Sequence, residues 1–412
     1  MNNESTNIFP KWATRSFFEE ILQNYHSDNN THKLLSYNVK TSENAGYASD
    51  MFFVDIKYTK ESGGRGQLLR IIIKVKPVSE MRRSVLNTMY KREIIIYRDV
   101  LPKIRKILSD NTIHTEIAPQ CLITQDEPIT LLALENLAGM GYSSADIRQG
   151  LDFNQTKSIL GKLAAFHACS VVINERYPEL FVPFHDPTIS HHPDQENFVI
   201  FFRVGVRGLL AELSTWKGHE EMVKKLTKLE ATIVDKGVEV YKWHKNTFNV
   251  LNHNDVWTSN MIFKHNNDGT IEDTLLLDYQ LCNWGSPGID LNFLFYGSVQ
   301  DHVRRNKLHE LIQHYHSVMA EILTKSNYAT EKIPSLDDIV KEMARTGFHG
   351  VNAALCLRPM AMMPPREDTQ METFLADNAE GVAFRRHVYG NPDYRRFIEP
   401  LLQEFDNLGY LD

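Results

Sequence analysis

The sequence has few of the features that mark secreted or membrane-spanning proteins. It contains 4 cysteines in 412 residues, and Cys121, Cys169, Cys282 and Cys356 lie far apart without a C-x-x-C pair. This pattern predicts reduced, mostly buried thiols and a cytoplasmic protein. No basic and apolar leader opens the chain, so we expect no signal peptide. No uncharged apolar run approaches the roughly 18 residues that a membrane span requires, so no membrane-spanning segment is expected.

The sequence also lacks an excess of basic residues. Its net charge is −7, which argues against nucleic acid as a partner. The histidine groups around 185–192 and 309–316 show no i,i+4 pairing and no nearby cysteine, so surface histidines are expected there rather than a zinc site. Hydrophobic residues make up 42% of the chain, and 412 residues are enough for two domains with sizeable cores.

One stretch, 251–290, carries most of the chemistry. His253, Asp255 and Asn260 form the pattern H-x-D-x-x-x-x-N of kinase catalytic loops, in which the Asp accepts the proton of the substrate hydroxyl and the Asn holds a metal ion. An apolar run then closes on Asp278, a carboxylate suited to Mg²⁺, which prefers oxygen ligands. A hairpin with surface Asp and Asn side chains would explain either the H-x-D-x-x-x-x-N pattern or the run ending at Asp278, if each stood alone. The two halves together favour a phosphoryl-transfer site.

The segments HNDVWTSN, LLLDYQL and GSPGIDL resemble the insect ecdysteroid kinase-like family, which is itself similar to choline and aminoglycoside kinases. The chain departs from the family's pattern at three positions, with Asn254 for the usual Gly, Ser259 for Asn and Tyr279 for Phe. None of these changes removes a carboxylate. The resemblance implies that Asp290 braces the catalytic loop by accepting backbone hydrogen bonds.

The resemblance implies an α+β, protein-kinase-like fold of two lobes. A small β-rich N-terminal lobe would cover 1–136, and a larger, mainly helical lobe would cover 137–412. The apolar pattern of the chain agrees with this order. It predicts a first helix over 17–25, strands around 35–40, 50–57, 68–76 and 131–137, and helices at 153–172, 197–214, 219–243, 301–323 and 335–346.

The N-terminal half offers a lysine and a glutamate for the nucleotide phosphates. Lys74 ends the apolar run 71–73, where a buried ammonium group would need a partner or a phosphate. The resemblance places this lysine against the phosphates of ATP and pairs it with Glu93 of the next helix. Lys76 competes on the same strand face, but Pro77 ends the strand just after it. An exposed strand end and a solvated helix residue are the plainer alternative.

Two further nucleotide contacts follow from position in the resemblance. The loop 43–49, with Gly46 and Ser49, would cover the ATP phosphates, although it lacks G-x-G-x-x-G and a polar hairpin would look the same. Backbone groups near Glu135 and Leu137 would hold the adenine. A plain edge strand followed by a loop explains these two residues equally well.

The resemblance implies a kinase that uses ATP and Mg²⁺ and acts on an alcohol group. An ecdysteroid or a similar hydrophobic alcohol is then the leading acceptor, with a choline-like amino alcohol or a detoxified plant toxin as alternatives. A catalytically silent ligand-binding protein is the alternative of another class. The methionine-rich stretch 348–363 would suit the wall of an acceptor pocket, and a buried helix explains it as well. A protein kinase is disfavoured, because no A-P-E segment follows Asp278.

Overall fold

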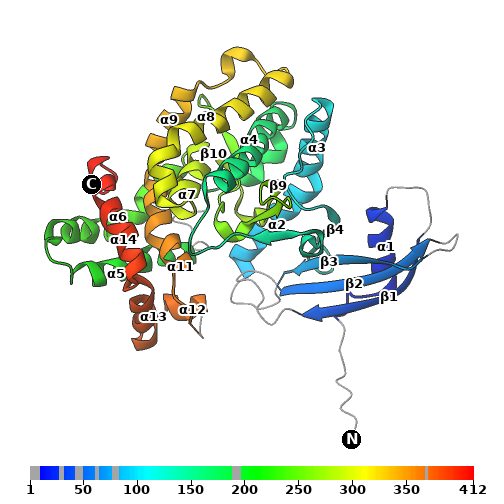
Figure 1. Cartoon of the computed structure of the whole chain (residues 1–412), viewed down its shortest axis with the longest axis horizontal. Helices are drawn as coiled ribbons and strands as arrows, with labels where there is room; N and C mark the ends of the chain where they lie inside the picture. The colour runs from blue at the N-terminus through cyan, green and yellow to red at the C-terminus, as the bar shows by residue number, and fades with distance from the viewer. Residues whose placement is uncertain are drawn as a thin grey trace, which may run out of the picture. The chain divides into compact units, whose positions relative to one another are not determined.

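The computed structural model of the chain divides into two compact units (Figure 1). The N-terminal unit comprises Met1–Asp99 and Ala118–Tyr142, and the C-terminal unit comprises Val100–Ile117 and Ser143–Asp412. The structure describes residues 10–26, 32–41, 50–60, 65–76, 83–187, 196–366 and 370–412.

The N-terminal unit is built on an antiparallel sheet of five strands in the order β1-β2-β3-β5-β4. The strands are β1 (His32–Thr41), β2 (Asp50–Lys60), β3 (Gln67–Val75), β4 (Cys121–Gln125) and β5 (Leu131–Glu135). Four of them lie close to the bounds expected from the sequence, whereas β4 is not among the expected strands.

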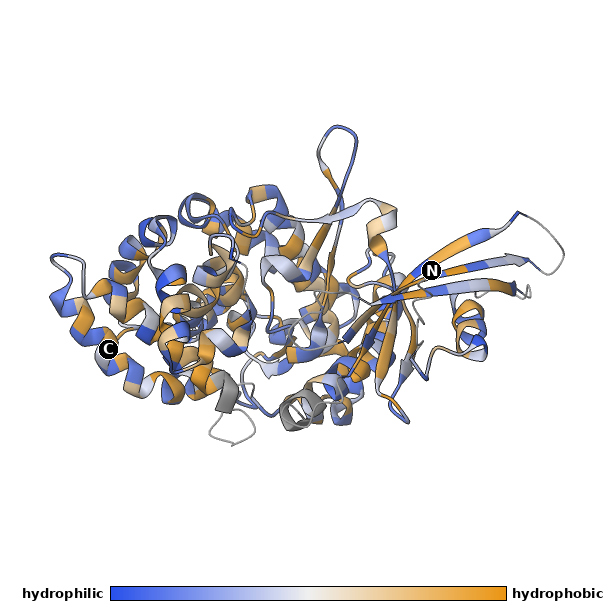
Figure 2. Cartoon of the chain, turned by 90° about the horizontal axis from the view of Figure 1, so that it is seen from below, coloured by the Kyte–Doolittle hydropathy of each residue, from blue (hydrophilic) through white to orange (hydrophobic). Residues whose placement is uncertain are grey.

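The helix α1 (Arg15–Tyr25) covers one face of this sheet. Thr14 caps the helix by accepting a hydrogen bond from the N–H of Phe17 at 3.3 Å. Phe18 and Ile21 are fully buried in the core that α1 shares with the strands. Burying an apolar side chain of this size contributes about 1.5–3 kcal/mol, so the pair holds the helix on the sheet. Figure 2 shows the apolar stretches of the strands in orange.

Strand β3 has two different faces. Ile71 and Ile73 are 0% exposed and lie in the core beneath α1, whereas Ile72 is partly exposed and shares the opposite face with Lys74. The apolar run 71–73 predicts a fully buried strand. Because side chains alternate along a strand, burial on one face leaves Ile72 on the other, where α2 carries Glu93.

The helix after β3 passes from one unit into the other. It runs as α2 (Arg83–Ile95), a π-helical turn (Ile96–Val100) and α3 (Leu101–Asp110). The expected lobe boundary at residue 136 puts α3 in the N-terminal lobe, but the segment 100–117 packs with the C-terminal unit. Its contacts explain this, since Ile117 O accepts the N–H of Leu276 at 2.9 Å and Thr115 Oγ1 accepts from Lys162 at 2.7 Å.

The C-terminal unit is mainly helical. Its helices are α4 (Phe153–Arg176), α5 (Glu196–Leu213), α6 (Glu220–Tyr241), α7 (Gly288–Gly297), α8 (Asp301–Lys325), α9 (Leu336–Arg345), α10 (Phe348–Asn352), α11 (Arg358–Ala361), α12 (Met371–Leu375), α13 (Ala379–Tyr389) and α14 (Pro392–Asn407). Two small sheets carry the strands β6 (Tyr142–Ser144), β7 (Val250–Asn252), β8 (Met261–His265), β9 (Ile271–Leu276) and β10 (Asn283–Gly285), in the orders β6-β8-β9 and β10-β7. The expected α+β class, with a β-rich N-terminal part and a larger, mainly helical C-terminal part, is confirmed.

Helix α4 forms the centre of the C-terminal unit, where it packs against α8 and β9. Of the described helices, α4 alone has the length and apolar composition that a membrane-crossing helix requires, although the sequence analysis expects no such segment. Of its most apolar window, 83% is buried inside the unit. Core helices of globular proteins have the same length and composition.

Candidate functional site

The loop between β7 and β8 brings two of the predicted site residues into direct contact. Asn260 donates from Nδ2 to Oδ2 of Asp255 at 2.7 Å and to the Asp255 carbonyl at 3.0 Å. The amide nitrogen of Asn260 therefore faces the carboxylate, which leaves Oδ1 as the amide atom not engaged with Asp255. Asp255 is partly exposed, whereas Asn260 is buried.

Asp290 holds this loop from the first turn of α7. Its two carboxylate oxygens accept the backbone N–H groups of His253 and Asn254, both at 2.6 Å. These are the contacts that the resemblance implies for this residue. Since Asp290 is 0% exposed, it contacts the loop and not the solvent side of the site. Two short, charge-assisted hydrogen bonds fix the backbone just before Asp255.

His253 connects the catalytic loop to the segment that carries Asp278. Its Nε2 lies 3.0 Å from the carbonyl oxygen of Leu277, and because a carbonyl only accepts, Nε2 carries the proton. Burial lowers the pKa of His253 below its usual value, so the ring is neutral. The histidine thus positions the residue directly before Asp278.

Asp278 and Asn254 both occupy the left-handed region, with φ of +66° and +62°. Non-glycine residues rarely adopt this conformation, and such residues gather at functional sites. Asn tolerates it better than other side chains, which explains how Asn254 can replace the family's usual Gly. Its side chain also adds two contacts that Gly lacks, since Oδ1 accepts from the Tyr241 hydroxyl at 2.8 Å and Nδ2 donates to Leu281 O at 3.2 Å.

His167 is a component of the site that the sequence analysis does not identify. The pattern of α4 predicts a packed core histidine, and His167 is indeed 0% exposed. Its Nε2 donates to Oδ2 of Asp290 at 3.0 Å, and its Nδ1 lies 2.7 Å from the Tyr315 hydroxyl. A row of hydrogen bonds therefore runs from α8 through α4 and α7 to the catalytic loop. No local pattern could reveal it, because the partners lie more than a hundred residues apart.

The residues around the loop fit a magnesium ion carried by a nucleotide. Asp278 offers a carboxylate that is oriented by Gln280, whose Nε2 donates to Oδ2 at 3.2 Å, and Asn260 offers its amide Oδ1. Mg²⁺ keeps several waters and takes one or two protein oxygens beside phosphate. Within the described ranges, no group of three or more His, Cys, Asp or Glu residues could hold a metal ion, so a metal here would also need ligands from the nucleotide and water.

In the N-terminal unit, Lys74 and Glu93 form a buried ion pair. Nζ of Lys74 lies 2.7 Å from Oε1 and 2.9 Å from Oε2 of Glu93, and the two residues are 8% and 2% exposed. The alternative of an exposed strand end and a solvated helix residue is therefore excluded. The pairing follows from the strand face, since Lys74 points toward the side where α2 lies.

The sheet face of Lys74 also carries an apolar row that the sequence analysis does not identify. Phe53 of β2 pairs with Ile72 of β3, which pairs with Leu134 of β5. Phe53 is 38% exposed. An apolar row beside a lysine could pack on the flat face of a base while the lysine reaches its phosphates.

The other predicted nucleotide contacts are placed as follows. The Glu135 side chain accepts the N–H of Gln120 at 2.8 Å, so the carboxylate ties β5 to the start of β4. Leu137 is buried and begins a short 3₁₀ turn, Leu137–Met140. Gly46 and Ser49 lie outside the described residues.

The methionine-rich stretch 348–363 lies largely inside the C-terminal core. Phe348, Val351, Leu355 and Cys356 are buried there, and the methionines are partly buried against the same cluster. Packing in the core therefore accounts for its apolar composition, in agreement with the alternative of a buried helix. The backbone runs as α10, a π-helical turn (Ala353–Leu357) and α11.

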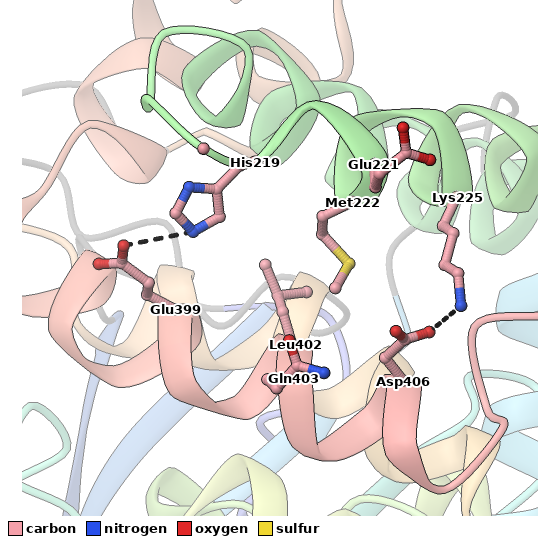
Figure 3. A pocket seen from close by; sticks show the side chains of 9 residues that line it. His219, Glu221, Met222, Lys225, Glu399, Leu402, Gln403 and Asp406 are labelled. Carbon is pink, nitrogen blue, oxygen red and sulfur yellow. Dashed lines mark hydrogen bonds and ion pairs between the residues drawn. The ribbon is translucent and has the colours of Figure 1, made fainter.

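A hollow of about 180 Å³ lies elsewhere in the C-terminal unit, between the start of α6 and α14 (Figure 3). His219 faces Glu399 across it at 3.3 Å, and Lys225 pairs with Asp406. None of the predicted site residues lines this hollow. The hollow is therefore separate from the predicted site residues.

Comparison with known proteins places the chain among kinase-like proteins. The model of the ecdysteroid kinase-like family matches residues 43–328. No curated protein matches the chain in sequence.

Solved structures with a likeness to the chain include three enzymes of 10–13% identity. An aminoglycoside phosphotransferase from Alicyclobacillus acidocaldarius is 12% identical over 90% of this chain and 92% of its own, with a TM-score of 0.34. A microcompartment-associated aminopropanol kinase is 13% identical over 93% and 98%, with a TM-score of 0.33. A choline/ethanolamine kinase family protein from Mesorhizobium loti is 10% identical over 91% and 92%, with a TM-score of 0.30.

Proposed function

Because the chain belongs to the ecdysteroid kinase-like family, we propose that it is a kinase that transfers the γ-phosphoryl group of ATP to a hydroxyl of an ecdysteroid or a similar hydrophobic alcohol. The observation that carries this proposal is the contact of Asp255 with Asn260, at 2.7 Å, on a loop held by Asp290. A carboxylate that only accepts hydrogen bonds, and that is partly exposed on such a loop, can take the proton of an incoming alcohol.

The roles divide between residues that act and residues that position them. Asp255 is the general base, and Asn260 and Asp278 are the ligands for Mg²⁺. His253 and Asp290 are positioning residues, since both are buried and contact the backbone around the base and the metal ligand.

The nucleotide would be held mainly by the N-terminal unit. Lys74 would bind the phosphates, with Glu93 keeping its side chain extended along the sheet. Backbone groups near Glu135 and Leu137, and the loop with Gly46 and Ser49, complete the proposed contacts. When bound, ATP would supply the phosphoryl group, and Mg²⁺ would neutralise the charge on the phosphate oxygens.

A catalytically silent binding protein is the competing function. Such a protein has no need for an ion pair between a strand lysine and a helix glutamate, nor for a metal ligand held in the left-handed region. These features are costly to maintain without a nucleotide. We therefore favour the enzyme, acting in the cytoplasm on a small molecule.

The decisive experiment is acceptor-dependent product formation. The purified chain is incubated with ATP, Mg²⁺ and one candidate alcohol at a time, and each alcohol is analysed by mass spectrometry for the addition of one phosphoryl group. We expect a phosphorylated ecdysteroid. ATP binding without any phosphorylated product, across steroids, amino alcohols and plant alcohols, would support the silent binding protein instead.

A further inference from the structure

Two buried polar side chains of α10 have no hydrogen-bond partner among the residues that the structure describes. His349 and Asn352, both on α10, are each 2% exposed. Among the described residues, none forms a hydrogen bond with either ring nitrogen of His349 or with the amide nitrogen or oxygen of Asn352. Buried polar atoms in folded proteins are almost always paired with protein or water, so four unpaired atoms within one helical turn require an explanation.

The pair lies beside residues that position the catalytic base. Helix α10 packs against α6 and α7. The ring of Tyr241, the last residue of α6, lies 5.4 Å from that of His349, and its hydroxyl bonds Asn254 next to Asp255. The ring of Phe293, from α7, stacks on the ring of His349, with the two centroids 5.4 Å apart and the planes at 25°.

The pair's own groups are uncharged, its neighbours are largely apolar, and the buried Asp290 carboxylate is the charged group that acts on His349. Val351 and Ala354 beside it are fully buried. Burial lowers the pKa of His349 to about 4, so the ring is neutral near pH 7 and offers one N–H donor and one acceptor. Asn352 offers two donors and two lone pairs. Such a set matches hydroxyl or keto oxygens and provides no countercharge for a cation.

The structure also indicates how this site could open. Phe293 is partly exposed, and its ring stacks on the ring of His349. Directly after Asn352 the backbone forms a π-helical turn, Ala353–Leu357, an irregularity that is frequent at functional sites. Rotation of the Phe293 side chain would uncover one face of the His349 ring without unfolding α10.

We propose that His349 and Asn352 are the polar anchors of the acceptor site and bind oxygen atoms of an uncharged, polyhydroxylated apolar alcohol. This inference rests on the proposed function, and it adds the residues and the chemical class of acceptor that they recognise. Apolar pockets with a few placed polar groups are typical of small-molecule sites.

The test uses substitutions that keep shape and remove polarity. In His349→Phe and Asn352→Leu, the unpaired atoms disappear, so the melting temperature should stay the same or rise, because an apolar replacement of unpaired polar groups is neutral or stabilising. The KM for ecdysone, with ATP saturating, should rise about tenfold through the lost hydrogen bonds. The KM for ATP should not change. His309→Phe, at an exposed position of α8, is the matched control and should leave every value unchanged.

Each outcome decides the matter. Melting temperatures that fall in both variants would show that an enclosed water or the protein itself satisfies these atoms, which overturns the proposal. An unchanged KM for ecdysone would also overturn it, as would choline or kanamycin outcompeting ecdysone in the wild type. A wild type that binds ATP and phosphorylates none of the three would refute the proposed function. The melting temperatures would then still show whether the pair is an unfilled polar site.

Discussion

At the scale of single residues, the chemistry depends on oxygen atoms held at fixed distances around one loop. Asp255 and Asn260 contact each other directly, whereas Asp278 lies two residues after the end of β9. The three can be varied separately, because Asp255 is proposed as the base and the other two as metal ligands. The contributions of base and metal ligand can therefore be distinguished by which step fails.

Asp255→Asn should abolish most turnover while leaving nucleotide binding intact. The amide keeps the size of the carboxylate but cannot take a proton, and loss of a general base costs about 10²–10⁴ in rate. The hydrogen bond from Asn260 is still accepted by the amide oxygen. Steady-state kinetics and ATP titration measure the two effects. Turnover near that of the wild type would contradict the assignment of Asp255 as base.

Asp278→Ala should uncouple ATP binding from magnesium. The proposed carboxylate ligand is removed, while Lys74 still contacts the phosphates. The Kd for ATP, titrated with and without Mg²⁺, should therefore differ far less in the variant than in the wild type. If Mg²⁺ tightens binding equally in both, another residue holds the metal.

Because buried His349 resists protonation, the free energy of unfolding should be lower in mild acid than at neutral pH. Its pKa is about 4 in the fold and near its ordinary 6.5 when unfolded, so below pH 6.5 the unfolded chain binds the proton first. The free energy of unfolding should fall between pH 6.5 and about pH 4, by an amount on the order of a few kcal/mol. Buried His253 acts in the same direction. Urea denaturation at several pH values measures the slope. The same slope in His349→Phe would mean that other groups cause it.

At the scale of elements, the local pattern predicted strands and helices well and their partners poorly. The run of isoleucines predicts β3, yet only the alternation in the sheet shows that Ile72 and Lys74 share a face. The pattern H-x-D-x-x-x-x-N locates the loop because its residues are close in sequence. It cannot locate His167, whose bond to Asp290 joins two helices. The positive φ of Asn254 was likewise hidden, although a polar residue at a glycine position was a signal for it.

The pairing of β3 with α2 should depend on a single carboxylate. Glu93→Gln leaves the Lys74 ammonium buried without a negative partner, and breaking a buried ion pair by removing one side costs about 3–5 kcal/mol. Both thermal stability and ATP affinity should therefore fall. Glu19→Gln is the matched control, because it breaks the exposed pair with Arg15 and should change stability by no more than about 0.5 kcal/mol. Equal shifts in the two variants would argue against a buried pair of this strength.

At the scale of the whole molecule, composition and the order of elements were sufficient to predict a β-rich part followed by a helical part. They did not predict that the segment 100–117 packs with the larger unit, because that depends on Lys162 and Leu276, far along the chain. The stretch 348–363 shows the same limit. Its methionines suit either the wall of an acceptor pocket or a buried helix, and in the structure they are partly buried against the C-terminal core.

The proposed preference among acceptors concerns the C-terminal unit, which carries His349 and Asn352. A cationic acceptor such as choline requires aromatic faces or carboxylates around its nitrogen, whereas a steroid requires an apolar trough with few polar anchors. The neutral pair His349 and Asn352, set among apolar side chains, favours the second kind. In a mixture at equal concentrations, an uncharged polycyclic alcohol should therefore be phosphorylated ahead of choline and an aminoglycoside. Mass spectrometry of the products gives the ratio directly. A dominant phosphocholine or phosphorylated aminoglycoside peak would show that the acceptor site is built for cations, and it would place recognition on carboxylates or aromatic faces other than this pair.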